Sequence, residues 1–287
     1  MEKLGKKFRW HIWGLFLGSI GFIFYIVLAQ ASTNLLKVVF IDVGQGDSIY
    51  IQAPNGNQVL VDGGQDGGIL KSLGEIIPFY DHSINVVVAT HPDKDHIGGL
   101  PSVLDNYQVD EVLEPGIPST TQTYAALENL ITEKKINKVL ARRGMNIWLD
   151  KEKGVYLQIL FPDQDVSSWK DTNEASIVAK LIYGKESFLL TGDSPQKIEK
   201  YLISLNHGEL KSNVLKLGHH GSRTSSSEEY LQAVSPDYAI ISAGLNNRYG
   251  HPHQEVLDLL AKLKIPSLKT FELGNITFET DGEKLFR

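Results

Sequence analysis

The chain of 287 residues contains no cysteine. Disulfide bonds, cysteine-rich zinc sites and thiol nucleophiles are therefore excluded, and any metal site must be built from histidine and carboxylate ligands. The sequence also lacks an excess of positive charge, since its formal net charge is −6. A polyanion such as nucleic acid would therefore have to be held locally, by metal ions or by a basic patch.

The sequence has no low-complexity block, no obvious repeat and, between residues 35 and 287, no stretch that resembles a linker. Its 42% hydrophobic and 22% charged residues are typical of a globular protein long enough to bury a large core. We therefore predict one domain over residues 35–287.

The first thirty residues differ from the rest. A charge-free run from Trp10 to the residue before Lys37 follows the basic residues Lys3, Lys6, Lys7 and Arg9. The run ends in the small-residue pattern Ala29-Gln30-Ala31 that a signal peptidase accepts. We expect residues 1–31 to be either a cleaved signal peptide or a retained transmembrane anchor, rather than a buried core helix. Both forms predict an extracytoplasmic protein, secreted or membrane-anchored, with membrane contact only if the segment stays uncleaved.

Beyond this segment, β-branched runs alternate with amphipathic stretches, and Asn55-Gly56 between two β-rich runs predicts a hairpin. Strands are expected at residues 36–42, 48–53, 58–62, 86–89, 109–113, 138–141, 156–161, 176–183, 187–190, 214–217, 238–241, 268–271 and 276–278. Helices are expected at 69–77, 100–106, 124–134, 227–234 and 254–263. Mixed sheets followed by helices indicate helix layers outside two packed sheets.

Four metal-capable side chains lie within six positions, directly after the apolar run of residues 85–88: His91, Asp93, Asp95 and His96. Imidazole nitrogen and carboxylate oxygen bind divalent cations, and side chains that alternate along an extended loop can converge on two adjacent ions. A lone Asp or His would more often be a solvated surface group. The complete string, placed at the end of a strand, predicts a metal site.

Three further apolar runs end in polar groups: at Asp193, at the pair His219-His220, and at the loop 246–253, which contains His251 and His253. Taken alone, Asp193 is typical of a turn. Adjacent histidines at the end of a strand are seldom core residues, and so they favour a functional role. The loop 246–253 fits either a functional or an ordinary surface loop.

Five ordered stretches resemble the metallo-β-lactamase superfamily and, within it, the extracytoplasmic hydrolase domain of ComEC-type competence proteins. They are Phe40-Ile41-Asp42-Val43-Gly44-Gln45-Gly46-Asp47-Ser48, residues 90–99, Leu189-Leu190-Thr191-Gly192-Asp193, His219-His220-Gly221-Ser222 and Tyr249-Gly250-His251-Pro252. The resemblance covers essentially residues 35–287. It implies an α/β (α+β) fold, a four-layer αββα sandwich with a dinuclear metal centre at one edge. The multi-helix channel region of ComEC is not in this chain, which resembles the hydrolase half alone on its own leader.

The resemblance also implies roles for individual residues. His91 and Asp93 would hold a first metal, Asp95 and His96 a second, and Asp193 would bridge the two. His220 is favoured over His219 as a further ligand of the second metal, with His219 near the substrate phosphate. Asp62 would support the metal loop, and His251 at the rim would protonate a leaving group. Catalytic roles are thus expected for Asp95, His219 and His251, and substrate contacts for Asn173, Ser176, Ser222 and His253.

Two departures from the family pattern concern the first metal. Asp93 stands where a histidine is usual, and no histidine occurs between Ile97 and Asn206, the interval that normally supplies a further ligand. Oxygen ligands favour harder ions, so Mn²⁺ or Mg²⁺ competes with Zn²⁺ for the two expected divalent sites. Asn173 or Ser176 lies where the missing histidine belongs, although a plain loop-to-strand junction explains that segment equally well.

These expectations define an exported metal-dependent hydrolase, a phosphodiesterase or nuclease that acts on DNA as the resemblance implies. The sequence itself offers a basic strip of Lys134, Lys135, Lys138, Arg142 and Arg143, together with Lys216, Arg223 and Arg248 near the proposed site. An envelope phosphodiesterase acting on cell-wall or lipid-derived substrates is the alternative enzyme. A non-catalytic module of a DNA-uptake or envelope system is the alternative of another class. The sequence identifies no protein partner.

Overall fold

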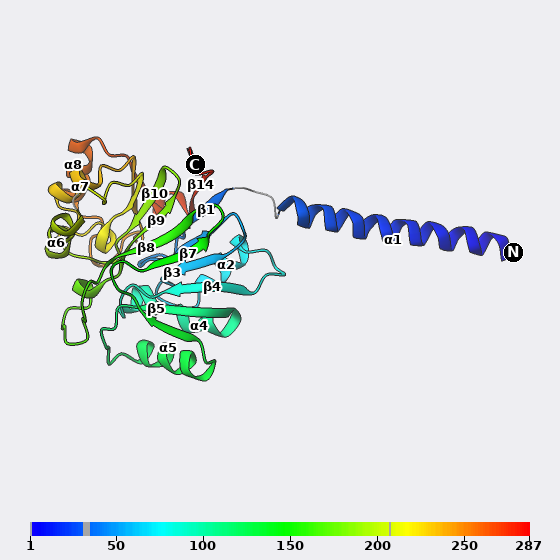
Figure 1. Ribbon diagram of the computed structural model, residues 1–287, viewed down its shortest axis with the longest axis horizontal. Helices are drawn as coiled ribbons and strands as arrows, with labels where there is room; N and C mark the ends of the chain where they lie inside the picture. The colour runs from blue at the N-terminus through cyan, green and yellow to red at the C-terminus, as the bar shows by residue number, and fades with distance from the viewer. Residues whose placement is uncertain (1, 31–34, 207) are drawn as a thin grey trace.

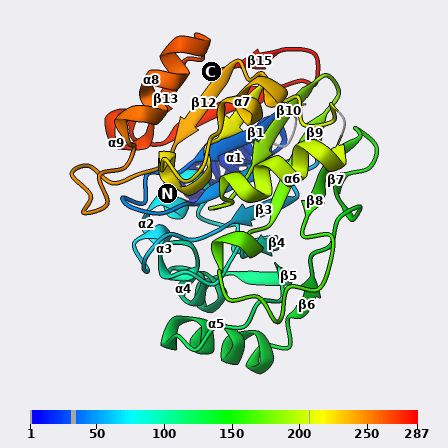
Figure 2. The same ribbon diagram turned by 90° about the vertical axis from the view of Figure 1, so that its left-hand side faces the viewer.

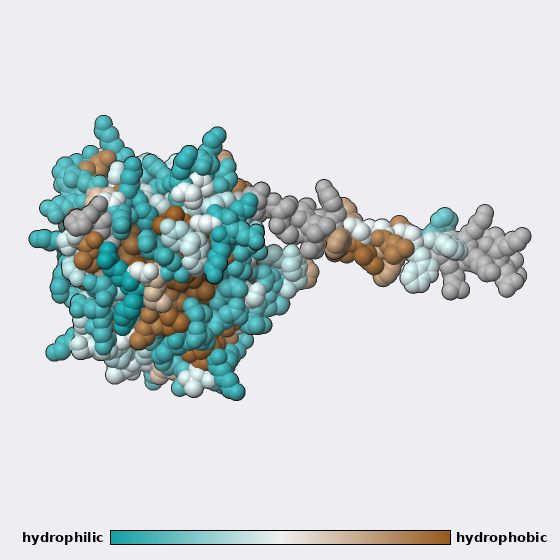
Figure 3. All heavy atoms as spheres, in the orientation of Figure 1, coloured by the Kyte–Doolittle hydropathy of each residue, from teal (hydrophilic) through white to brown (hydrophobic). Residues whose placement is uncertain are grey.

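The computed structural model describes residues 2–30, 35–206 and 208–287. Helix α1 (Glu2–Gln30) extends away from the body of the molecule as a single rod (Figure 1), and its described side chains are largely apolar (Figure 3). Among the described residues, no helix is both long enough and apolar enough to cross a membrane. Ala31 of the expected cleavage pattern lies outside the described residues.

The first sheet of the body consists, in the described part of the chain, of eight strands in the order β15-β14-β1-β2-β3-β4-β5-β6. Strand β2 pairs antiparallel with β3 across the turn at Asn55-Gly56, as the sequence predicts, whereas β3, β4, β5 and β6 run parallel. The strands are β1 (Leu36–Phe40), β2 (Ile49–Gln52), β3 (Gln58–Val61), β4 (Ser83–Val88), β5 (Gln108–Glu114), β6 (Asn137–Leu140), β14 (Ile276–Thr280) and β15 (Leu285–Phe286).

The second sheet has the order β13-β12-β11-β10-β9-β8-β7, and β10, β11, β12 and β13 run parallel. Its strands are β7 (Asn146–Asp150), β8 (Val155–Phe161), β9 (Val178–Tyr183), β10 (Glu186–Leu190), β11 (Val214–Lys216), β12 (Tyr238–Ile241) and β13 (Ser267–Lys269). Both sheets therefore contain a block of parallel strands, whose carboxyl ends lie together at one edge.

Helices cover the outer face of each sheet (Figures 1 and 2). Those on the first sheet are α2 (Ile69–Ile76), α3 (Lys94–Ile97), α4 (Leu100–Asn106) and α5 (Gln122–Glu133). Those on the second sheet are α6 (Gln196–Asn206), α7 (Glu228–Val234) and α8 (Gln254–Leu263), and a short α9 (Thr270–Leu273) follows β13. The predicted four-layer αββα sandwich is thereby confirmed.

Alternation along the strands builds this layering. In β1, Val38 and Phe40 belong to the core between the sheets, while Val39 points to the core beneath the helices of the first sheet. The ring of Phe278 lies 6.2 Å from that of Phe40 in its own sheet and 6.1 Å from that of Phe188 in the other sheet. Aromatic side chains thus join the two sheets.

Several local predictions are wrong. The metal-binding string is not an extended loop throughout, because Lys94–Ile97 forms one helical turn (α3), which is too short to show a helical period in the sequence. Helix α6 and strand β7 were not predicted. The strand predicted over residues 268–271 ends at Lys269, where α9 begins. The strand predicted from Ser176 begins at Val178, after a 3₁₀ turn over Asn173–Ala175.

Candidate metal centre

The polar residues singled out in the sequence converge where the carboxyl ends of parallel strands meet. Asp62 follows β3, the segment from His91 to His96 follows β4, Asp193 follows β10 and the pair His219-His220 follows β11. Strands β3 and β4 belong to the first sheet, and β10 and β11 to the second. The site therefore lies at one edge of the sandwich and draws on both sheets.

The most compact part of the site joins His96, Asp193, His220 and Asp95. His96 Nε2 lies 3.2 Å from Asp193 Oδ1, and His220 Nε2 lies 3.4 Å from Asp193 Oδ2 and 3.3 Å from Asp95 Oδ2. Tetrahedral ligands at about 2.0–2.1 Å from a cation lie about 3.3 Å from one another. The separations therefore fit a single divalent ion, at the position predicted for the second metal.

The predicted first site is looser. His91 Nε2 lies 3.9 Å from Asp93 Oδ2 and 4.0 Å from Asp193 Oδ2, and the Asp93 side chain is 43% exposed. The segment where a further histidine would be expected supplies Thr172, whose hydroxyl donates a hydrogen bond to Asp93 Oδ1 at 2.7 Å. Thr172 thus holds the carboxylate of Asp93 in place of adding a nitrogen ligand.

Several atoms of this cluster are buried without a hydrogen-bond partner among the described residues: Nε2 of His91, His96 and His220, and Oδ1 of Asp193. A buried polar atom without a partner costs about 1–3 kcal/mol, so four in one cluster require an explanation. The three ring nitrogens lie 3.2–4.0 Å from oxygen atoms of Asp193, and imidazole and carboxylate groups form a donor set that divalent cations bind. The residues present therefore fit divalent metal ions.

Each histidine of the compact part is oriented through its other ring nitrogen. His96 Nδ1 lies 2.8 Å from Asp62 Oδ2, and the same carboxylate accepts hydrogen bonds from the backbone N–H and the hydroxyl of Thr90 at 2.8 and 2.7 Å. His220 Nδ1 lies 2.9 Å from the carbonyl oxygen of Ser242. Such partners fix the tautomer and direct Nε2 toward the cation. Asp62 thus has the contacts that a supporting residue requires.

Asp47 has no predicted role, and the structure places it against His220. Its carboxylate is buried, with Oδ1 3.2 Å from His220 Nδ1. Lys216 Nζ, also fully buried, donates to Asp47 Oδ2 at 2.5 Å and to the Leu217 carbonyl at 2.8 Å. Asp47 lies in the loop between β1 and β2, two residues before Ile49, so it lacks the position directly after a strand that marks the other residues of the site. The burial of Lys216 within β11 was not readable from the sequence, which placed this lysine among possible nucleic-acid contacts.

Asp47 also belongs to a tight group with His96, Asp193 and His220, in which one ligand atom from each residue lies within 4.8 Å of the others. Gly46 makes this approach possible: its φ is +123°, and a Cβ there would lie 2.1 Å from the Asp95 carbonyl oxygen. One oxygen of Asp47 is taken by Lys216, and the other faces the cluster. Asp47 therefore braces His220 and adds negative charge beside the second site.

Histidines and carboxylates of opposite charge lie close together in the cluster and shift one another's pKa values. Burial lowers the pKa values of His96 and His220, but the neighbouring carboxylates have a larger, opposite effect. Asp193 and Asp62 raise the pKa of His96 well above its usual value. Asp193 and Asp47 do the same for His220. Burial raises the pKa of Asp193, yet His220 and His96 hold it well below its usual range. Protons on these histidines thus occupy the positions that a cation would take, and metal binding must displace them.

The backbone carries strain at the same residues. Asp62, His219 and His220 have φ values of 59°, 49° and 56°, a left-handed conformation that side chains with a Cβ rarely adopt. Such strain persists where the surrounding structure holds it in place, and it is concentrated at functional sites. The turn at Gly218–Gly221 points the two neighbouring histidines in different directions.

His219 and His251 form the rim of the site. The side chain of His219 is 28% exposed, with Nε2 3.7 Å from Asp193 Oδ2, whereas His220 is buried. The His251 ring lies 5.2 Å from that of His219, and burial together with the charges of His219 and His220 lowers the pKa of His251 to about 4. His251 is therefore neutral at pH 7, and the predicted role as proton donor requires the charge of a bound substrate to raise its pKa.

The predicted substrate contacts occupy different environments. Ser176 and Ser222 are buried: Ser176 Oγ accepts the Asp193 N–H at 3.3 Å, and Ser222 Oγ accepts from the hydroxyl of Thr224 at 3.0 Å. His253 Nδ1 accepts the Arg223 N–H at 3.1 Å. Asn173 Oδ1 is buried without a partner among the described residues, so this amide is the most available of the four. All four remain predictions as substrate contacts.

A histidine and carboxylate cluster at the edge of an αββα sandwich defines the class of a metal-dependent hydrolase. The family model of the metallo-beta-lactamase superfamily matches residues 41–244, and the chain belongs to this superfamily. The family resemblance drawn from the five motifs is thereby confirmed.

Individual proteins similar to this chain extend that result. ComE operon protein 3 of Bacillus subtilis is 34% identical over 289 residues, which cover 91% of this chain and 35% of that protein. Competence protein ComA of Neisseria gonorrhoeae is 30% identical over 262 residues, which cover 90% of this chain and 34% of that protein. The chain thus spans about a third of the length of these curated relatives.

A solved structure shows the same fold at low sequence identity. Igni18, a metallo hydrolase from the archaeon Ignicoccus hospitalis, superposes with a TM-score of 0.52 at 15% identity, covering 86% of this chain and 99% of that one. At this identity the likeness concerns the fold, and the chemistry has to be argued from the residues of this chain.

Proposed function

We propose that this protein hydrolyses phosphodiester bonds and that its substrate is DNA. The observation that carries the proposal is the buried cluster of His96, Asp193 and His220 with Asp95 and, more loosely, His91 and Asp93. Similarity to a competence protein supports DNA as the substrate class.

His96, Asp193, His220 and Asp95 would hold a divalent cation, which would lower the pKa of a water molecule toward neutrality and offset negative charge on the phosphoryl oxygens. The protein residues then position the reacting groups. The neutral ring of His219, whose Nδ1 lies 3.1 Å from Thr224 Oγ1, presents Nε2 toward the site, where it can donate to a phosphate oxygen when Nε2 carries the proton. His251 lies beside it, and a phosphate anion there favours its protonated form, which can donate a proton to the leaving oxygen.

Hydrolysis assays with the full chain test this function. We expect turnover of bis-p-nitrophenyl phosphate and of a DNA oligonucleotide with Mn²⁺ or Zn²⁺, and a loss of roughly 100-fold or more in Asp95→Ala because a ligand of the compact site is removed. Glu152→Ala removes an exposed carboxylate far along the chain from the site and serves as the control. Absence of turnover with Mn²⁺, Zn²⁺ and Mg²⁺, or full activity in Asp95→Ala, would refute the proposal.

The predicted basic strip does not favour DNA. Lys138 Nζ lies 2.7 Å from Glu128 Oε2 and 3.1 Å from Glu114 Oε1, and Lys134 Nζ lies 3.4 Å from Asp105 Oδ1. These ion pairs offset the charge of two of the five cations in the strip. Lys216 is fully buried against Asp47 and is inaccessible to a substrate.

The ion pairs of Lys134 and Lys138 and the net charge of −6 favour a second candidate, hydrolysis of small envelope phosphodiesters such as glycerophosphodiesters. Comparing kcat/KM for single-stranded DNA with that for glycerophosphocholine separates the two. A ratio well above one supports DNA, and a ratio well below one supports the envelope substrate.

We also propose that residues 1–31 place the domain outside the cytoplasm. The basic start followed by a charge-free run supports this location. Fusion of alkaline phosphatase after Arg287 tests it: phosphatase activity in intact cells is expected, and an inactive, fully expressed fusion would contradict it.

A further inference from the structure

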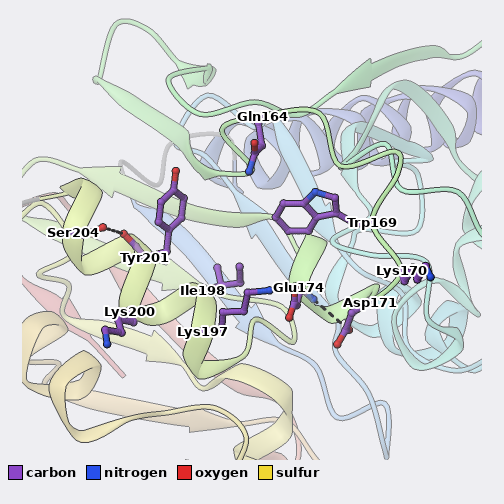
Figure 4. Close-up of a pocket in the computed structure, with 10 residues that line it drawn as sticks. All are labelled: Gln164, Trp169, Lys170, Asp171, Glu174, Lys197, Ile198, Lys200, Tyr201 and Ser204. Carbon is purple, nitrogen blue, oxygen red and sulfur yellow. Dashed lines mark hydrogen bonds and ion pairs between the residues drawn. The ribbon is translucent and has the colours of Figure 1, made fainter.

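A cavity of about 780 Å³ lies between the segment of residues 163–174 and helix α6 (Figure 4). Its lining includes two aromatic residues, Trp169 and Tyr201, and three lysines, Lys170, Lys197 and Lys200. The motifs of the metal centre do not include any of these residues, and α6 itself was not expected from the sequence.

The middle of the cavity is apolar and bordered by rings. Trp169 and Tyr201 lie on opposite sides in Figure 4, with Ile198 between them. Both rings pack against Phe161, at centroid distances of 6.1 and 6.4 Å, and the Tyr201 hydroxyl donates to Asp163 Oδ2 at 2.7 Å. These contacts hold both rings in place at the wall of the cavity. A flat apolar group fits such a site.

Cations flank the rings on both sides. Lys170 lies on the side of Trp169 and Lys200 on the side of Tyr201, and both are exposed (Figure 4). Lys197 Nζ contacts Glu174 Oε2 at 2.6 Å across the cavity edge. The order of cation, ring, ring and cation along the cavity matches a base with a phosphate on either side, whereas a lipid or a glycerophosphodiester offers no ring for Trp169 and Tyr201.

Both walls of the cavity are connected to the metal centre. Lys170 and Asp171 directly precede Thr172, whose hydroxyl bonds Asp93, and α6 begins three residues after Asp193. Consecutive Cα atoms are about 3.8 Å apart, so both walls of the cavity end close to the metal centre. A DNA strand bound in the cavity would therefore lie near the proposed site of hydrolysis.

We propose that this cavity binds one nucleotide of single-stranded DNA, with its base against Trp169 and Tyr201 and its flanking phosphates on Lys170 and Lys200. The inference rests on the proposed function, because it names a contact of the same substrate. Base stacking on aromatic rings and backbone contacts to lysine are the two elements of binding to single strands without sequence preference.

Binding of a fluorescein-labelled dT10 to the full chain, followed by anisotropy in EDTA, tests the site without hydrolysis. In Lys170→Glu/Lys200→Glu, Kd should rise at least tenfold at about 50 mM salt, and the slope of log Kd against log salt should fall by about 1.4, the value for two phosphates. Trp169→Leu should raise Kd roughly 5- to 20-fold through loss of stacking. The control Lys151→Glu/Lys211→Glu makes the same change of net charge at exposed positions elsewhere and should stay within twofold of the unaltered protein.

The results separate this site from the proposed function. Unchanged binding in Lys170→Glu/Lys200→Glu, an equal effect of the control pair, or displacement of dT10 by glycerophosphocholine as readily as by unlabelled dT10 overturns the inference. Lys170 and Lys200 are exposed, so the variant that replaces both should fold. The test therefore still stands if Trp169→Leu fails to fold. If the unaltered protein binds dT10 through this site but hydrolyses no phosphodiester, the proposed function fails and the binding site stands. If both hold, the ratio of kcat/KM for the oligonucleotide to that for bis-p-nitrophenyl phosphate falls about tenfold in the charge variant.

Discussion

Replacing Lys216 with methionine is expected to destabilise the metal-free protein by about 3–5 kcal/mol. Lys216 and Asp47 are both buried, and their charged atoms lie 2.5 Å apart. At an effective dielectric constant of about 20, the Coulomb attraction is roughly 7 kcal/mol, and removing each ion from water costs several kcal/mol. The intact pair therefore contributes little net stability, but removing Lys216 leaves the buried Asp47 carboxylate without its strongest partner, with His220 at 3.2 Å as the remaining one, which is the source of the large loss.

Urea unfolding followed by far-UV circular dichroism in EDTA measures this loss as a shift of the midpoint at constant slope. Lys211→Met changes an exposed lysine and should alter the free energy of unfolding by about 0.5 kcal/mol or less. The double variant Asp47→Asn/Lys216→Met should be more stable than Lys216→Met, because no unpaired charge remains. Zn²⁺ should restore part of the loss, since the second oxygen of Asp47 faces the metal cluster. A loss below about 1 kcal/mol in Lys216→Met, or additive effects in the double variant, would refute the reasoning.

Asp62→Asn should weaken metal binding about 10- to 100-fold by isothermal titration calorimetry, because His96 loses the carboxylate that orients it; unchanged affinity would show that the contact is dispensable. Thr172→Val should weaken one of two metal-binding events about tenfold and leave the other unaltered, since its hydroxyl holds the predicted first-site ligand Asp93; equal weakening of both would contradict the asymmetric site. The raised pKa values of His96 and His220 stabilise the metal-free protein below the unfolded value of about 6.5, and this contribution is lost as pH rises through the raised values. Over pH 6–9 metal affinity should therefore rise while stability in EDTA falls, and a flat affinity would argue against proton displacement.

The sequence allowed prediction of elements whose pattern is local. The hairpin at Asn55-Gly56 follows from turn chemistry, and the boundaries of α4 and α8 are those expected from their apolar periodicity. Helix α6 has a similar pattern, with Ile198 and Leu202 buried, and it was overlooked although Pro195 precedes it directly. The single turn α3 is too short for any periodic signal.

The metal cluster could be predicted from the sequence because the residues singled out follow strands, and parallel strands bring their carboxyl ends together. The sequence did not show which residue each member of the cluster contacts. The pairing of Asp47 with Lys216 joins the loop between β1 and β2 of one sheet to β11 of the other, and the hydrogen bond from Thr172 to Asp93 spans 79 positions. Such contacts depend on how the two sheets pack, so no spacing in the chain predicts them. The cavity beside α6 could not be predicted from the sequence for the same reason.

Anomalous diffraction from crystals soaked in Mn²⁺ or Zn²⁺ tests the central claim most directly. The structure predicts a strong peak bounded by Asp95, His96, Asp193 and His220 and a weaker one beside His91 and Asp93. The absence of a peak within about 2.5 Å of His96 Nε2 and His220 Nε2 at saturating metal would contradict the assignment of this cluster as a metal centre.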